Sequence, residues 1–188
     1  MKAIQIDGYK KGEIKVTLRE VDMPQVGDHD ILVKVKATAV NPLELLIAHG
    51  DVKLVVPYQF PLTLGNEMSG VVEQIGTKVK KFKKGDRVFA RLPINRIGAF
   101  AEYVTIDASA VAKTPDYLSD VEAAAVPLTA LTAEQALDIL NLKSDSSLFI
   151  SGGSGSFGAM AIPLAAARGL SNNKWWSKSE RAHKRTWC

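Results

Sequence analysis

The sequence predicts a mainly β, barrel-like domain over residues 1–115, followed by the first strand and helix of an α/β domain over residues 116–169. Three observations lead to this prediction. Short runs of alternating apolar and polar residues, separated by glycine and proline, fill the first part. Helix-starting signals and helical apolar spacing begin at Ser119. A glycine-rich turn then follows the apolar run Leu148–Ile150 and precedes another helical pattern.

Six strands are expected in the first domain, from short strand-like runs separated by turn residues such as glycine and proline. These runs cover residues 3–7, 14–20, 30–40, 71–76, 87–91 and 100–106. The run Asp30–Val40 is the most regular, with Val33 and Val35 on one face, which is typical of a half-buried antiparallel strand. Between the strands, Leu43–His49 is expected to form one or two helical turns that end at Gly50.

The second domain is expected to begin with helices. Ser119–Glu122 has the spacing of a capping box, and Thr129–Leu140 places apolar residues along one helical stripe. Leu148–Ile150 predicts a short buried strand, and Phe157–Arg168 predicts a helix. Pro163 lies inside that helix and is expected to kink it or to mark an early turn.

The net charge of +4 comes entirely from the end of the chain. Residues 1–169 carry 19 Lys and Arg against 19 Asp and Glu, whereas residues 170–188 carry five against one. The basic run Lys78–Lys84 leads into a Gly-Asp turn and is interpreted as a solvated turn. A nucleic-acid partner is therefore not expected, because the body of the chain offers a polyanion no excess of positive charge.

Cysteine use and hydropathy point to a cytoplasmic protein. Cys188 is the single cysteine, which excludes an intrachain disulfide and a cysteine-based metal cluster. No stretch approaches the about 20 apolar residues that span a bilayer, and the N-terminus enters strand-like alternation without the apolar core of a secretory signal. We therefore expect no membrane partner.

The segment Gly153–Gly158 fits the pattern G-x-G-x-x-G. Glycines let a backbone turn tightly and approach a pyrophosphate, while the start of the following helix offers free amides and partial positive charge. Its place between an apolar run and a helix strengthens the interpretation as a dinucleotide site. The alternative is a packing turn between strand and helix with no ligand.

Taken together, the body of the chain resembles the medium-chain dehydrogenase/reductases, specifically their zinc-independent quinone oxidoreductase (zeta-crystallin-like) branch. The resemblance covers about residues 1–170 and rests on six short motifs in the order of that family. They are Val40–Pro42 with Glu44 close by, Gly65–Val72, Gly85–Val88, Gly98–Val104, Leu131–Ala133 and the glycine-rich turn. The resemblance implies a GroES-like barrel, which is the catalytic domain, followed by a Rossmann domain that binds the cofactor.

The resemblance also implies that the chain holds no zinc. Zinc-dependent members place a histidine ligand directly before the glutamate of the second motif, and here that position is Asn66, before Glu67. No cysteine lies near Asn41, and the cysteine-rich lobe for structural zinc is missing. His49 remains, but an isolated histidine at a helix end is interpreted as a surface or packing residue.

The cofactor implied by the resemblance is NADPH, which would pass a hydride to a quinone or to the β-carbon of an enone. Asn41 would lie near the nicotinamide, and Thr132 near the cofactor phosphate. The residues expected to wrap the pyrophosphate are Gly152, Gly153, Ser154, Gly155, Ser156 and Phe157. The structural alternatives are an Asn-Pro turn for Asn41 and a helix-surface hydroxyl for Thr132. Tyr58 is either a cleft residue or a packing residue, and no proton donor is assigned.

Residues 170–188 depart abruptly from the family pattern. Trp175 and Trp176 become two glycines when their codons are read one nucleotide later, so we expect a frameshift that ends the chain inside the Rossmann domain and cripples its activity. A natural short paralogue with its own tail is the alternative. The competing function is a non-enzymatic GroES-like barrel that acts as a binding or assembly module. For either function a homodimer is an open expectation.

Overall fold

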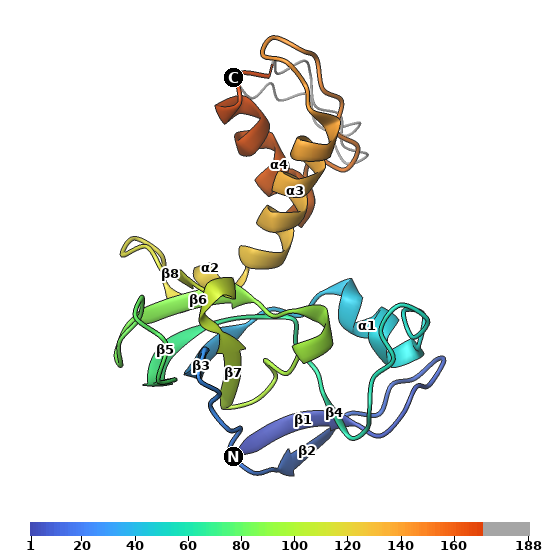
Figure 1. Cartoon of the computed structure of the whole chain (residues 1–188). Helices are drawn as coiled ribbons and strands as arrows, with labels where there is room; N and C mark the ends of the chain where they lie inside the picture. Colours follow the sequence, from blue (N-terminus) through green and yellow to red (C-terminus); the bar gives the residue numbers. More distant parts are fainter. Residues whose placement is uncertain (171–188) are drawn as a thin grey trace. The chain divides into compact units, whose positions relative to one another are not determined.

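The computed structural model describes residues 1–170, and the chain divides into two compact units, Met1–Pro127 and Leu128–Cys188 (Figure 1). The tail discussed above, residues 171–188, lies outside the described residues. The division falls later than the predicted boundary at residues 115 and 116. The difference is the short helix α2, Asp120–Ala124, which packs on strands of the first unit.

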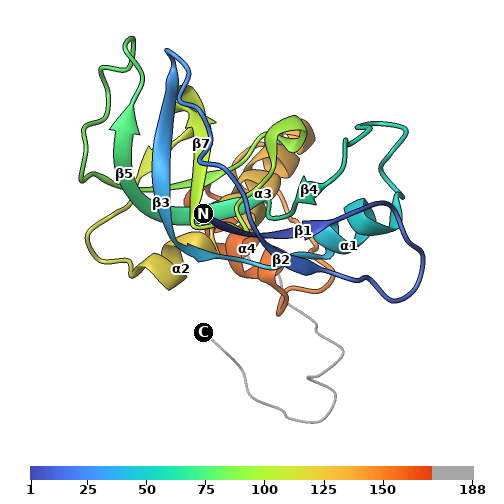
Figure 2. The same ribbon diagram turned by 90° about the horizontal axis from the view of Figure 1, so that it is seen from below.

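The strands of the first unit form two antiparallel sheets. The smaller sheet has the order β2-β1-β4, and the larger has the order β7-β3-β5-β6-β8; Figure 2 shows β3 between β5 and β7. The strands are β1 (Lys2–Ile6), β2 (Thr17–Glu20), β3 (Asp30–Thr38), β4 (Leu62–Thr63), β5 (Glu67–Ile75), β6 (Arg87–Arg91), β7 (Tyr103–Asp107) and β8 (Ala112–Lys113). The helical elements of the unit are α1 (Pro42–His49), α2 and the 3-10 turns η1 (Ile94–Arg96) and η2 (Ala108–Ala110).

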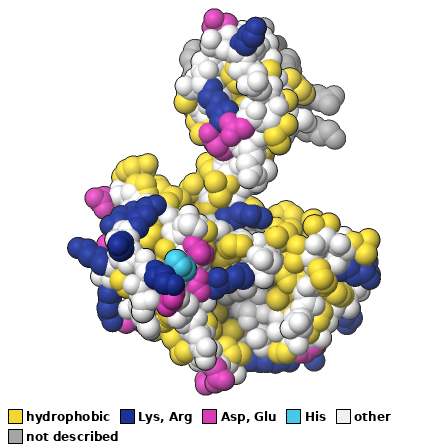
Figure 3. All heavy atoms as spheres, in the orientation of Figure 1, with side chains coloured by type: hydrophobic (Ala, Val, Ile, Leu, Met, Phe, Trp, Pro, Cys, Tyr) yellow, Lys and Arg dark blue, Asp and Glu magenta, His cyan; other side chains and the backbone are white. Residues whose placement is uncertain are grey.

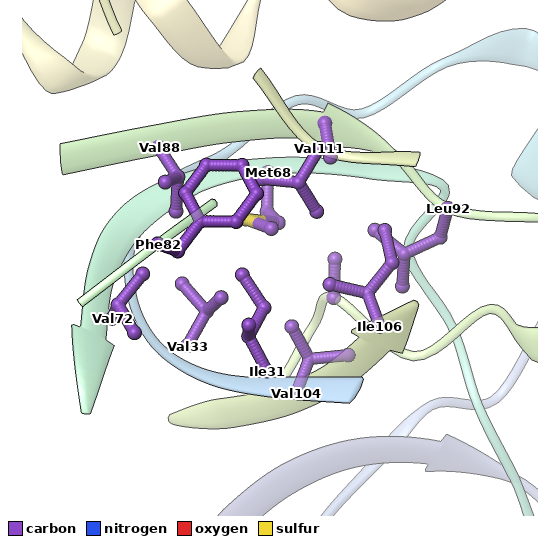
Figure 4. Close-up of a cluster of buried hydrophobic side chains, with 12 residues drawn as sticks. Ile31, Val33, Met68, Val72, Phe82, Val88, Leu92, Val104, Ile106 and Val111 are labelled. Carbon is purple, nitrogen blue, oxygen red and sulfur yellow. The ribbon is translucent and has the colours of Figure 1, made fainter. Parts of the chain in front are cut away.

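Alternation along the strands explains part of the core of the larger sheet. Val33 and Ile31 of β3 are fully buried and Val35 is half-buried, but Leu32 is buried as well, so the burial of β3 departs from strict alternation. Ile31 and Val33 meet Met68 and Val72 of β5 in one apolar cluster (Figure 4). The remaining buried members come from β6, β7 and the connecting turns. The predicted half-buried strand is confirmed, although it ends at Thr38 rather than Val40.

Hydrogen bonds from two side chains of the larger sheet hold α2 against it; we call them the polar clamp. Arg87 of β6 donates to the Asp120 carboxylate at 2.9 Å and to the Leu118 carbonyl at 2.7 Å. The Ser69 hydroxyl of β5 donates to the Asp120 carbonyl at 2.5 Å. The predicted capping box begins the helix, with the Ser119 hydroxyl accepting from the amide three residues later. The clamp places α2 in the first unit.

The second unit consists of two helices in its described part, α3 (Pro127–Leu140) and α4 (Ser156–Ala167). Leu137 of α3 and Ala165 of α4 are buried together with Leu170. Arg168 joins the helices through ion pairs with the two acidic residues of α3. Since α4 runs through Pro163 as one helix, the alternative of an early turn there is not observed.

The prediction of a strand at Leu148–Ile150 is wrong for the described residues, where this run belongs to no strand. A strand exists through hydrogen bonds to a neighbouring strand, and no strand of the described second unit accompanies it. Leu148 and Ile150 pack instead against α3 and α4. Phe149 is exposed. The apolar signal therefore identified burial correctly for part of the run but not its hydrogen-bonding partner.

On the face in Figure 3, lysine and arginine side chains of the first unit are interspersed with aspartate and glutamate. Lys78, Lys84 and Lys113 each pair with a carboxylate. Mixed charge of this kind gives a polyanion little to bind. No helix among residues 1–170 combines the length and the apolarity that crossing a membrane requires.

A close backbone approach in the larger sheet yields a stability prediction. A Cβ added to Gly70 of β5 would lie 2.3 Å from the Lys34 carbonyl oxygen and 2.7 Å from Val33 Cγ1. Gly70→Ala must therefore push β3 and β5 apart, and we expect a loss of about 3 kcal/mol in the free energy of unfolding, measured in urea. The control is Gly8→Ala, where the added Cβ meets nothing within 4 Å. Equal stability of the two variants would contradict this expectation.

Candidate functional site

The candidate residues fall into two places in the chain. Asn41 begins α1 in the first unit, beside an arrangement of buried polar side chains. Thr132 lies on α3 in the second unit, and the glycine-rich turn leads into α4 of the same unit. Each place is described separately below.

Asn41 is the N-cap of α1 and is tied to Glu44 through the backbone. The Asn41 N–H donates to Glu44 Oε2 at 2.7 Å, and the Glu44 N–H donates to the Asn41 carbonyl at 3.1 Å. Pro42 occupies the first helical position, where no N–H is needed. A glutamate three residues after the N-cap is the sequence signature of this reciprocal arrangement.

The second oxygen of Glu44 holds the beginning of β5. Glu44 Oε1 accepts from the Asn66 backbone N–H at 3.1 Å and from Asn66 Nδ2 at 2.7 Å. Glu44 is 3% exposed and Asn66 is 0% exposed. Three amide donors therefore meet one buried carboxylate, which is how a buried charge avoids an uncompensated desolvation cost. Asn66 Oδ1 is buried without a hydrogen-bond partner.

Glu67 is the second buried carboxylate of the cluster and is 1% exposed. Its Oε1 accepts from Asn41 Nδ2 at 2.7 Å. The Thr38 hydroxyl donates to the Glu67 carbonyl at 2.6 Å and connects this position to β3. We call Asn41, Glu44, Asn66 and Glu67 the amide–carboxylate cluster. From the sequence, Glu44 was named only beside the first family motif, although its spacing from Asn41 is that of a capping box. No local pattern predicts that Glu67 reaches Asn41, 26 residues away.

Zinc does not fit the amide–carboxylate cluster. The nitrogen atoms of Asn66 and Asn41 that face the carboxylates are amide donors, which cannot bind a cation, and Zn²⁺ prefers thiolate, imidazole and carboxylate ligands. No three His, Cys, Asp or Glu side chains among residues 1–170 are grouped as a metal site. His49 lies elsewhere, with Nε2 at 3.1 Å from the Gly12 carbonyl oxygen.

Tyr58 takes part in packing within the first unit. Its hydroxyl donates to the Ile94 carbonyl at 2.7 Å, and its N–H donates to the Tyr9 hydroxyl at 2.9 Å. Burial, followed by the proximity of Tyr9, raises the pKa of the Tyr58 phenol. The phenol proton is thus held by a backbone carbonyl, which favours the packing interpretation of this residue.

The glycine-rich turn is shaped by two close backbone approaches. Gly152 has a φ of 73°, in the left-handed region, and its carbonyl accepts from the Gly155 N–H at 2.9 Å. A Cβ on Gly158 would lie 2.3 Å from the Gly153 carbonyl oxygen, so α4 can meet the turn only because residue 158 lacks a side chain. Gly155 is the N-cap of α4 and supplies no side-chain cap.

These features suit a pyrophosphate at the start of α4. The first amides of a helix have no partner within the helix, and no capping side chain covers them here. The residues Gly152, Ser154, Gly155, Ser156 and Phe157 are exposed at this turn, and Gly153 is half-buried. The geometry provides room and donors for phosphate oxygens, although a packing turn would also use Gly158.

Thr132 is exposed, and its hydroxyl donates to the Leu128 carbonyl at 2.6 Å, one helical turn earlier. A phosphate could use this hydroxyl as a donor only after that bond breaks. Phe157 borders an apolar cavity of about 190 Å³ together with Leu137 and Leu148. Phe157 lies in the first turn of α4, and Thr132 lies on the surface of α3.

Residues 27–116 match the family of the alcohol dehydrogenase GroES-like domain. The chain is 36% identical over 171 residues to a chloroplastic quinone-oxidoreductase homolog of Spinacia oleracea, covering 88% of this chain and 52% of the relative. The quinone oxidoreductase of Coxiella burnetii has a similar structure, with a TM-score of 0.86, 30% identity and coverage of 97% of this chain and 58% of the other. The Escherichia coli quinone oxidoreductase complexed with NADPH is also similar, with a TM-score of 0.77 and 28% identity. The match covers 90% of this chain and 51% of the other. The chain spans about half the length of the curated relatives it matches.

Two capping-box glutamates allow a matched test of the buried cluster. Glu44 uses both oxygens as acceptors, whereas Glu122 accepts from the Ser119 N–H and hydroxyl through Oε2. Glu44→Gln must turn one NH₂ group toward an amide donor, and we expect a loss of about 2–3 kcal/mol in the free energy of unfolding. Glu122→Gln can keep both bonds through its remaining oxygen, so its loss should be much smaller. Urea unfolding of both variants checks this, and equal losses would argue against a special role of burial.

We also expect the purified chain to carry no tightly bound zinc, because the Asn41 and Asn66 NH₂ groups face the buried carboxylates as donors and cannot bind a cation. Elemental analysis after dialysis measures this directly. One zinc ion per chain, retained through dialysis against a weak chelator, would contradict the prediction.

Proposed function

Because the chain belongs to the quinone oxidoreductase-like branch of the medium-chain dehydrogenase/reductase superfamily, we propose that its residues are those of a zinc-independent enzyme that transfers a hydride from NADPH to a quinone or an enone. That this activity is impaired in the present chain stays a prediction. The observation that carries this proposal is the approach of Gly158 to Gly153 at the start of α4. That approach leaves a helix start with free amides at a bend that no side chain covers.

We propose that the pyrophosphate of NADPH binds at the amides following Gly155. Two physical terms favour an anion there: hydrogen bonds from unpaired helix amides and the partial positive charge of the helix start. The E. coli neighbour was solved as a complex with NADPH, which supports the choice of cofactor. Thr132 is a weaker candidate for a phosphate contact, since its hydroxyl already donates to Leu128.

We propose that Asn41 lies near the nicotinamide. Asn41 is half-buried and is held by Glu44 and Glu67, so its amide group is fixed before any ligand arrives. NADPH, when bound, supplies the hydride, and the contribution of these residues is orientation. Negative charge that develops on the substrate oxygen would be met by hydrogen-bond donors rather than by a metal ion.

The competing proposal is a binding or assembly module without catalysis. It is favoured by the first unit, which has a buried apolar core of its own and two sheets within residues 1–127. Such a module needs no nucleotide, so its response to NADPH separates the two proposals. A homodimer and a cytoplasmic location also remain proposals, to be tested by light scattering and by cell fractionation.

Titration of the chain with NADPH, followed by the fluorescence of the reduced nicotinamide, tests the proposed function. We expect saturable binding, and we expect Gly158→Ala to weaken it by about tenfold or more, because the new Cβ would displace the Gly153 carbonyl and the turn with it. Gly8→Ala, in an open turn of the first unit, is the control and should bind as the original chain does. Absence of any NADPH response in the original chain would favour the binding-module proposal.

A further inference from the structure

We infer that Glu67 and Glu44 are positioning residues that hold the Asn41 amide in one orientation for its ligand. The functional meaning of this inference rests on the proposed function, in which Asn41 meets the nicotinamide. The orientation itself is a property of the ligand-free chain, and it is carried by the contacts of the amide–carboxylate cluster.

Glu67 fixes the direction of the Asn41 amide. Asn41 Nδ2 donates to Glu67 Oε1 at 2.7 Å, so the NH₂ group of the amide faces Glu67. Rotating the amide by half a turn would bring its oxygen against Glu67 Oε1, acceptor against acceptor. Because Glu67 is 1% exposed, water would compensate little of that repulsion.

Glu44 fixes the backbone from which the Asn41 side chain projects. Its Oε2 accepts from the Asn41 N–H, and its Oε1 accepts from both donors of Asn66. Asn66 precedes Glu67 in the chain, so the same carboxylate that sets the backbone of residue 41 also anchors the segment that carries Glu67. Glu44 thereby holds the main chain of Asn41, and Glu67 holds its side chain. The two carboxylates are linked through Asn66.

Stability alone gives a weak account of this arrangement. Two buried carboxylates are costly to desolvate, and an apolar pair of the same volume often stabilises a fold as well or better. The cluster ends at Asn41, which is half-buried rather than enclosed. A costly buried arrangement that ends at a half-buried asparagine is suited to presenting its amide in one defined direction.

A donor–acceptor exchange tests the inference. Asn41→Asp places one carboxylate against another, and Glu67→Gln permits both orientations of the Asn41 amide. In Asn41→Asp/Glu67→Gln the acceptor and donor are exchanged, the total charge is that of the original chain, and Asp remains a good N-cap. We expect each single variant to weaken NADPH binding, Asn41→Asp by about tenfold, and the double variant to regain most of the loss. Urea unfolding of the same variants reports their stability.

The two readouts separate positioning from a purely structural role. The positioning role is overturned if the single variants lose stability and the double variant regains it, while all folded variants bind NADPH equally. A double variant that binds no better than Asn41→Asp overturns it as well.

A ligand-free measurement separates this inference from the proposed function. In the ¹⁵N-labelled chain, the Asn41 side-chain NH₂ signals are assigned by their loss in Asn41→Asp. We expect Glu67→Gln to speed their hydrogen exchange by about tenfold, since the bond to a buried carboxylate is replaced by a weaker one. Unchanged exchange would overturn the inference even if NADPH binds. Faster exchange in a chain that does not bind NADPH would leave the orientation established and refute the proposed function.

Discussion

The buried carboxylate of Glu44 is the interaction on which the arrangement of the first unit's polar residues depends. A charge that is 3% exposed must be matched by donors, and Glu44 finds them at the start of α1 and at the start of β5. The two elements are distant in sequence, yet their ends are joined through a single side chain. Asn41 and Asn66 then have little freedom, and Glu67 follows directly from the placement of Asn66.

The amide–carboxylate cluster and the glycine-rich turn each hold polar groups in a fixed geometry, but by different means. The amide–carboxylate cluster uses side chains that are locked by charge-assisted hydrogen bonds. The glycine-rich turn uses the absence of side chains, since Gly158 lets α4 approach the Gly153 backbone and Gly152 adopts a positive φ. The first solution gives direction to one amide group, whereas the second leaves backbone amides open to a large anion.

The spacing of apolar residues predicted most of the helices and strands, because an element that is buried on one face needs apolar residues at regular intervals. The strand β6 is found as predicted, at Arg87–Arg91, and the helix after the glycine turn is displaced by one residue at each end. The two-residue strands β4 and β8 are too short to show alternation. Leu148–Ile150 failed because a strand depends on a neighbour that no local pattern encodes. For the same reason the bond between Glu67 and Asn41 was not predicted.

The two capping boxes differ in how freely their sequences can drift. At α2, on the surface, water can replace a lost bond, so Ser119 and Glu122 can each be exchanged separately. At α1, a change of Glu44 leaves donors of both Asn41 and Asn66 unmatched inside the protein. A single substitution at Asn41, Glu44 or Asn66 therefore destabilises the protein. A different set of residues can replace them only if all three positions change together. Among homologous chains, we expect the three positions to be inherited as a set, with co-variation between them where the set has changed.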